Sequence, residues 1–198
     1  SGRSIISYGT LGAPNVVGEG YRVLYEDTPR ARVPVGFSCE VKANGRMFPL
    51  TARGVLGEHL MQPILAAFAV GLALEIDLSR IAQELQNMPY PDGRMRLIPG
   101  RRDSVIIDDS YNASPIAVTA ALRTLGALQH GKARRIAILG DMAELGSFGT
   151  AEHEKLGPLA AEVLDVLVTV GPLGKLLAKA AREAGMDESC ILRFESSI

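Results

Sequence analysis

The pattern of apolar and polar positions changes near residue 58 and divides the chain into two kinds of sequence. Before this point, short alternating runs are broken by glycine and proline, which is typical of β-strands joined by turns. The clearest example is a pair of runs, 36–43 and 46–52, that flank Asn44-Gly45. Because Asn and Gly tolerate the positive φ of a type I′ turn, this segment predicts a β-hairpin.

After residue 58 the apolar residues recur at helical spacing and then switch between strand and helix patterns. Residues 63–74 are apolar on every side and predict a buried helix, with Pro63 in the first turn, where its missing N–H costs little. A second helix is predicted at 79–87. Further along, strands are predicted near 95–98, 104–108, 135–140, 166–170 and 191–194, and helices at about 115–128, 151–164 and 173–184.

Strands separated by single helices imply right-handed crossovers and a mainly parallel sheet. The predicted fold class is therefore α/β: a Rossmann-like, mainly parallel sheet with flanking helices, preceded by a partial mixed α/β domain with the β-hairpin. Pro and Gly punctuate residues 90–94, which predicts a boundary between domains 1–92 and 93–198. We also expect Pro158 to interrupt the helix that begins near Thr150, because proline removes a backbone donor.

Composition and charge exclude several classes of protein. Hydrophobic residues make up 47% and charged residues 22% of 198, which excludes a disordered chain. The net charge of −1 gives no electrostatic footprint for nucleic acid or an anionic membrane. The longest charge-free apolar stretch, 60–74, is shorter than the ~20 residues of a membrane helix. Two distant cysteines, Cys39 and Cys190, favour a reduced, cytoplasmic setting.

Candidate chemistry gathers at the corner between a predicted strand and helix, residues 105–115. Ser114 is suited to cap a helix whose first residue is Pro115. Asp108 and Asp109 point to opposite faces of the strand, at the carboxyl end where open α/β sheets place ligands. Such an acidic pair repels free phosphate, so a ribose, a cation or an arginine is the better partner. The alternative is that both acids only cap the turn.

Four motifs resemble those of a known family, in the same order and spacing. Asp108-Asp-Ser-Tyr-Asn-Ala-Ser-Pro resembles the Asp-Asp-Ser-Tyr-Asn-Ala-Asn-Pro signature of the Mur ligases that add D-alanyl-D-alanine to the peptidoglycan precursor. Gly93-Arg-Met resembles the junction of that family's central and C-terminal domains. The other two are Leu139-Gly-Asp-Met-Ala-Glu-Leu-Gly, followed by His153, and Gly57-Glu-His with Leu65-Ala-Ala. The resemblance spans nearly the whole chain.

The resemblance implies an ATP-dependent amide ligation. Enzymes of this kind phosphorylate the carboxylate of a UDP-N-acetylmuramoyl tripeptide, and the amine of D-Ala-D-Ala attacks the acyl phosphate. ATP and Mg²⁺ are the implied cofactors. The implied partners are the UDP-muramoyl peptide, D-Ala-D-Ala and the rest of the ligase chain, with no nucleic acid and no membrane.

The same resemblance assigns residues to a nucleotide pocket. Arg94 matches an arginine that contacts the nucleotide, and Asp109 matches the acid that meets its ribose. Tyr111 and Asn112 are placed to wall the same pocket. We assign no catalytic residue.

A second group of residues is a candidate for the substrate cleft: Asp108, Asp141, Glu144 and His153. Asp141 and Glu144 follow a predicted strand end, although solvated loop acids are an equally open interpretation. For His153 the competing interpretation is an exposed side chain near the start of a helix capped by Thr150. With His59 and His130, the three histidines and two cysteines have no metal-ligand spacing, so we predict no metal site.

Several family features are missing from this sequence, and they limit what we expect of it. The P-loop, the Mg²⁺ and lysine residues, the UDP-binding domain and the closing Lys-Gly-Ser segment have no counterpart. The main phosphate and metal ligands are thus absent. The nearest approach to a P-loop, 171–175, lacks the spacing and predicts a strand-to-helix turn with Leu177 and Ala181 buried. Pro63 and Ser114 each replace an asparagine, which puts nucleotide affinity in question. We expect the end of a central domain and most of a C-terminal domain, inactive by itself.

Three alternatives stay open. One is a non-catalytic binding module that kept the Mur-like scaffold. Another is a related ATP-dependent amino-acid ligase with a different substrate. A dinucleotide-binding domain is the weakest of the three, because the loop after Leu139 lacks the Gly-x-Gly-x-x-Gly spacing.

Overall fold

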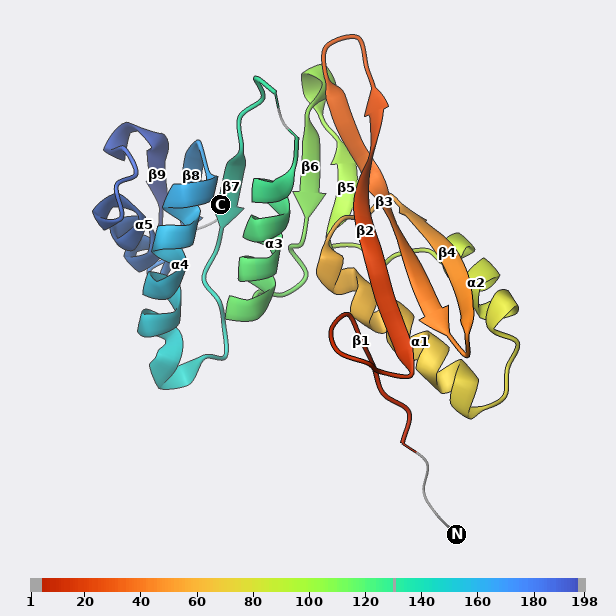
Figure 1. Ribbon diagram of the computed structural model, residues 1–198. Coiled ribbons are helices and arrows are strands. Elements are labelled where there is room, and N and C mark those ends of the chain that lie inside the picture. Colours follow the sequence, from red (N-terminus) through yellow and green to blue (C-terminus); the bar gives the residue numbers. More distant parts are fainter. Residues whose placement is uncertain (1–4, 130, 196–198) are drawn as a thin grey trace. The chain divides into compact units, whose positions relative to one another are not determined.

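The computed structural model describes residues 5–129 and 131–195, so His130 lies outside the described residues. Contacts within the chain divide it into two compact units, residues 1–108 and 109–198. Figure 1 shows the elements of each unit. Each unit has a hydrophobic core of its own. The predicted boundary near residues 90–94 stays a proposal.

The first unit is built on a sheet with the strand order β1-β2-β3-β4. The strands are β1 (Tyr8–Gly9), β2 (Val16–Asp27), β3 (Arg32–Ala43) and β4 (Arg46–Arg53). β2, β3 and β4 are antiparallel neighbours, and β1 runs parallel to β2. The hairpin predicted around Asn44-Gly45 is confirmed: Asn44 has a φ of 49° and Gly45 a φ of 70°, both positive as a type I′ turn requires.

Two helices cover this sheet, α1 (Met61–Ala73) and α2 (Leu78–Asn87) (Figure 1). They follow a 3₁₀ turn, η1 (Glu58–Leu60), and confirm the helices predicted at 63–74 and 79–87. Phe68 of α1 is fully buried against Phe48 of β4, with ring centroids 5.3 Å apart. The carboxylate of Asp77 caps α2 by accepting a hydrogen bond from the Ser79 N–H.

The next two strands form a separate ladder. β5 (Arg96–Pro99) and β6 (Val105–Asp108) are antiparallel to each other and are joined by η2 (Arg101–Asp103). A short connection replaces the helix that a parallel crossover needs, which explains the antiparallel pairing. A bridge between Val55 and Arg96 connects the ladder to the rest of the first unit, to which it belongs.

The second unit holds a parallel sheet with the strand order β7-β8-β9. Strands and helices alternate, as predicted for an α/β domain. The elements are α3 (Pro115–Ala127), β7 (Ile136–Leu139), η3 (Gly146–Phe148), α4 (Gly149–Val163), β8 (Val166–Val170), α5 (Gly174–Glu183), η4 (Glu188–Cys190) and β9 (Ile191–Phe194).

The two faces of this sheet differ. On one face Ala137, Leu167 and Ile191 are buried, and α5 packs against β8 and β9. On the other face Ile138 is 73% exposed and Phe194 is 52% exposed. Within the described residues, the helices therefore cover one side of the sheet far more completely than the other.

The predicted break at Pro158 is wrong, because α4 continues from Gly149 to Val163 with Pro158 inside it. Pro158 and Glu154, whose carbonyl loses its helical partner, are both exposed, a position where water is able to bond that carbonyl in place of the missing N–H. The predicted Thr150 cap is also wrong: the helix begins at Gly149, and no side chain caps it.

The two cysteines differ in environment, and we expect them to differ in reactivity. Cys39 is 3% exposed, and burial raises the pKa of its thiol to about 11, whereas Cys190 is half-buried. At pH 8 only about one Cys39 in a thousand is a thiolate, and the thiolate is the nucleophile. A chromogenic disulfide reagent should therefore titrate one thiol in the native chain and two in guanidinium chloride. Two thiols reacting equally fast in the native chain would contradict the buried position of Cys39.

Candidate functional site

The strand-to-helix corner at residues 108–115 has the predicted local form. β6 ends at Asp108, and Ser114 caps α3 by accepting a hydrogen bond from the Ala117 N–H at 3.3 Å. Pro115 is the first helical residue. However, β6 pairs with β5 and not with the parallel sheet, so the expected parallel pairing at this corner is wrong.

The side chains of this corner range from half-buried to exposed. Asp108 and Asp109 are half-buried, whereas Tyr111 is 73% exposed. Asn112 is exposed, and its side-chain oxygen accepts a hydrogen bond from the Ala113 N–H at 2.9 Å. The corner thus presents two carboxylates, a phenol and an amide within five consecutive residues.

Arg94 lies in a tight turn before β5, with an exposed side chain. Its neighbours Gly93 and Met95 both have positive φ, at 66° and 54°. Met95 is 1% exposed and accepts a main-chain hydrogen bond from Leu56, which anchors the turn. Arg94 belongs to the first unit and Asp109 opens the second, and their convergence on one pocket stays a prediction.

The Gly57-Glu-His motif forms the turn that begins the helical part of the first unit. Gly57 has a φ of 127°, and a Cβ there would lie 2.5 Å from the His59 ring. The Gly57 N–H donates a hydrogen bond to the Tyr21 hydroxyl, and burial raises the pKa of Tyr21. The motif therefore needs glycine for both conformation and space.

The loop after β7 brings together two of the predicted cleft residues. Asp141 Oδ1 accepts a hydrogen bond from the Gly174 N–H at 2.7 Å, at the first residue of α5. The next N–H along the chain, that of Met142, donates to Nε2 of His153 at 2.9 Å. Glu144 is exposed on the same loop.

The expectation of an exposed His153 is wrong, because this side chain is fully buried. The acids on either side of His153 suggested a helix start that faces water. Glu152 is itself half-buried, however, and the histidine side chain points inward, where it accepts a hydrogen bond from the loop. Sequence reasoning also missed Gly174 as a partner of Asp141. The signal was present: a strand-to-helix turn was predicted at 171–175, and it is confirmed, with Leu177 1% exposed and Ala181 fully buried.

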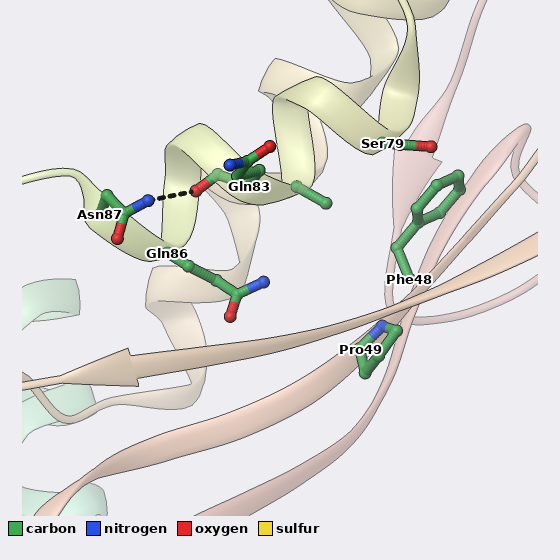
Figure 2. A pocket seen from close by; sticks show the side chains of 7 residues that line it. Phe48, Pro49, Ser79, Gln83, Gln86 and Asn87 are labelled. Atoms are coloured by element: carbon green, nitrogen blue, oxygen red, sulfur yellow. Dashed lines mark hydrogen bonds between the residues drawn. The ribbon is translucent and has the colours of Figure 1, made fainter.

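Two surface hollows lie away from these residues. The first, about 330 Å³, lies between β4 and α2 (Figure 2): Phe48 and Pro49 line it from the strand, and α2 lines it with Ser79, Ala82 and three residues that carry carboxamides. Its carboxamides belong to Gln83, Gln86 and Asn87, and Asn87 donates a hydrogen bond to the Gln83 carbonyl oxygen. The second hollow, about 400 Å³, lies in the second unit and is lined by Arg123, Gly126, Arg135, Leu159, Glu162 and Val163. Neither is lined by a predicted site residue.

A family profile described as "Mur ligase, glutamate ligase domain" matches residues 93–196, more than half of the chain. This chain belongs to the Mur ligase family. Two curated relatives are named UDP-N-acetylmuramoyl-tripeptide–D-alanyl-D-alanine ligase. The one from Mycobacterium tuberculosis is 38% identical over 69% of this chain, and the one from Bacillus subtilis is 32% identical over 64% of it.

Solved Mur ligases resemble the structure as well. A crystal structure of MurF from Acinetobacter baumannii matches 96% of this chain with a TM-score of 0.75 and 27% identity, and 37% of that chain is covered. This Mur ligase segment spans 28% of each of the two curated relatives. In the described residues no helix has the length and apolar character to cross a membrane.

Proposed function

We propose that this chain is part of an ATP-dependent ligase that joins D-alanyl-D-alanine to a UDP-N-acetylmuramoyl tripeptide through an acyl phosphate. The observation that carries the proposal is the Asp108–Pro115 corner. It has seven of the eight residues of the signature of the D-Ala-D-Ala-adding ligases, Ser114 being the exception, and they form the strand end and capped helix that the sequence predicts. The names of the curated relatives support the same substrate pair.

The described residues suit the ribose and phosphate contacts of a nucleotide site better than its metal ion. The half-buried Asp109 carboxylate is suited to accept hydrogen bonds from ribose hydroxyls, and the exposed Arg94 is suited to contact a phosphate. Tyr111 and Asn112 would wall the pocket. When bound, ATP would supply the phosphoryl group that activates the carboxylate.

Magnesium has a weaker case in this segment. No group of three or more His, Cys, Asp or Glu side chains in the described residues is arranged to hold a metal ion. We propose that the main Mg²⁺ ligands of the ligase lie outside this segment, as the family residues missing from its sequence imply.

The test is ligase activity of the complete protein that contains this segment. Phosphate release should require ATP and both peptide substrates. Release with another amino acid in place of D-Ala-D-Ala would instead support a related amino-acid ligase. Nucleotide binding without any turnover would support a non-catalytic module.

Two substitutions in that complete protein should separate binding from turnover. Asp109→Asn removes one charge from the predicted ribose contact and should weaken ATP binding by about 1.5–3 kcal/mol. Arg94→Ala should lower turnover with little effect on folding, because the side chain is exposed. Isothermal titration with ATP, steady-state rates and thermal unfolding would measure the three quantities. Unchanged ATP affinity and turnover in both variants would remove these residues from the site.

A further inference from the structure

The imidazole of His153 is fully buried, and both of its nitrogens are bonded. Nε2 accepts the Met142 N–H at 2.9 Å, and Nδ1 lies 2.7 Å from the Gly149 carbonyl oxygen. Because Nε2 is an acceptor, the ring proton sits on Nδ1 and is donated to that carbonyl. A ring with no exposed surface and no spare nitrogen does not contact a substrate.

The two hydrogen bonds of His153 connect different parts of the fold. Gly149 is four residues earlier on the same helix, so the Nδ1 bond is local. Met142 lies eleven residues away on the preceding loop, so the Nε2 bond joins that loop to α4. Met142 is itself only 2% exposed, and its neighbour Asp141 bonds the first N–H of α5. Residues 141–142 are therefore held by two helices at once.

The anchored residues begin a loop that has an unusual backbone. Glu144 has a φ of 63°, which is costly for a residue with a side chain, and Gly146 has a φ of 54°. Leu145, between them, packs against the core of the unit. The loop follows the carboxyl end of β7, the edge where open α/β sheets bind ligands.

We propose that His153 is a positioning residue for the ligase reaction, acting through its Nε2 bond to hold residues 140–148 in one preformed arrangement. The inference rests on the proposed function. Holding the loop in place before substrates bind removes an ordering cost that would otherwise weaken binding and slow the reaction. His153 thereby sets the position of Glu144, which is exposed on this loop.

A pair of substitutions separates the two bonds. The amide oxygen of His153→Gln reaches about as far as Nε2 and can keep the bond to Met142. His153→Asn ends near the position of Nδ1, so it can keep the Gly149 bond but not the loop bond. In the complete protein, hydrogen exchange of the Met142 amide should speed up by about ten-fold in His153→Asn, the effect of losing one hydrogen bond. In His153→Gln it should change much less.

The steady-state rates should distinguish the same two variants. We expect kcat/KM for the peptide substrates to fall about ten-fold in His153→Asn and to be largely restored in His153→Gln, with an unchanged KM for ATP. Glu154→Gln, at an exposed position beside His153, is the matched control and should change neither the exchange nor the rates.

Two results would overturn the inference. One is an unchanged Met142 exchange rate in His153→Asn. The other is an activity that falls equally in both variants in step with their thermal stability, with no change in KM, because that marks a purely structural role. If the wild-type protein shows no ligase activity, the proposed function fails. The Met142 exchange rates still decide whether His153 holds the loop.

Discussion

The 198-residue chain by itself should release no phosphate above background from ATP, Mg²⁺, a UDP-muramoyl tripeptide and D-Ala-D-Ala. Phosphoryl transfer depends on groups that position and neutralise the phosphates, and losing them costs roughly 10³-fold or more in rate. The turn whose sequence is most like a phosphate loop, residues 171–175, is unsuited to replace these groups. The first N–H of α5 there is already bonded to the Asp141 carboxylate, whose charge repels phosphate.

A continuous phosphate-release assay would measure this loss. The complete protein, at the same molar concentration and with the same substrates, is the positive control. Circular dichroism should establish that the short chain is folded before its rate is read. Phosphate release that depends on both peptide substrates, from the purified short chain, would show that the expectation is wrong.

Gly157→Ala should destabilise the second unit by about 1–3 kcal/mol, although alanine favours helices by about 1 kcal/mol over glycine. A Cβ at Gly157 would lie 2.4 Å from Cβ of Ala180 and 2.6 Å from its carbonyl carbon. The obstacle is the backbone of α5, so α4 and α5 must move apart. Urea denaturation followed by circular dichroism would give the free energy of unfolding.

Gly126→Ala is the matched control, because it makes the same change inside α3. Its Cβ would lie 3.1 Å from a methyl group of Val163, a side chain that can adjust. The free energy of unfolding should then change by less than about 1 kcal/mol. If the Gly157→Ala protein were as stable as the Gly126→Ala protein, α4 and α5 would not be as close together as the structure has them.

Local chemistry made much of the fold predictable. The Asn44-Gly45 hairpin, the Ser114 cap with Pro115, and strands such as 166–170 each depend on a few neighbouring residues, and the structure confirms them. The antiparallel pairing of β6 was not predictable in this way. Pairing depends on which strand meets which, and that is decided by contacts far apart in sequence.

The candidate site shows the same division. The residues of the Asp108–Pro115 corner were found from their order alone, and the convergence of Arg94 on Asp109 stays a prediction. The burial of His153 was missed because its partner is the main chain of Met142, and no side-chain pattern in the sequence records such a bond. Pro158 was misjudged because the cost of a helical proline depends on whether water reaches the freed carbonyl.

The uncovered face of the β7–β9 sheet bears on how this segment behaves in a test tube. Ile138, Leu192 and Phe194 are between 48% and 73% exposed on that face, on a chain with a net charge of only −1. Apolar strands that face water favour self-association, and little net repulsion opposes it here. Colloidal solubility, rather than folding free energy, should therefore set the highest workable concentration of the separate segment.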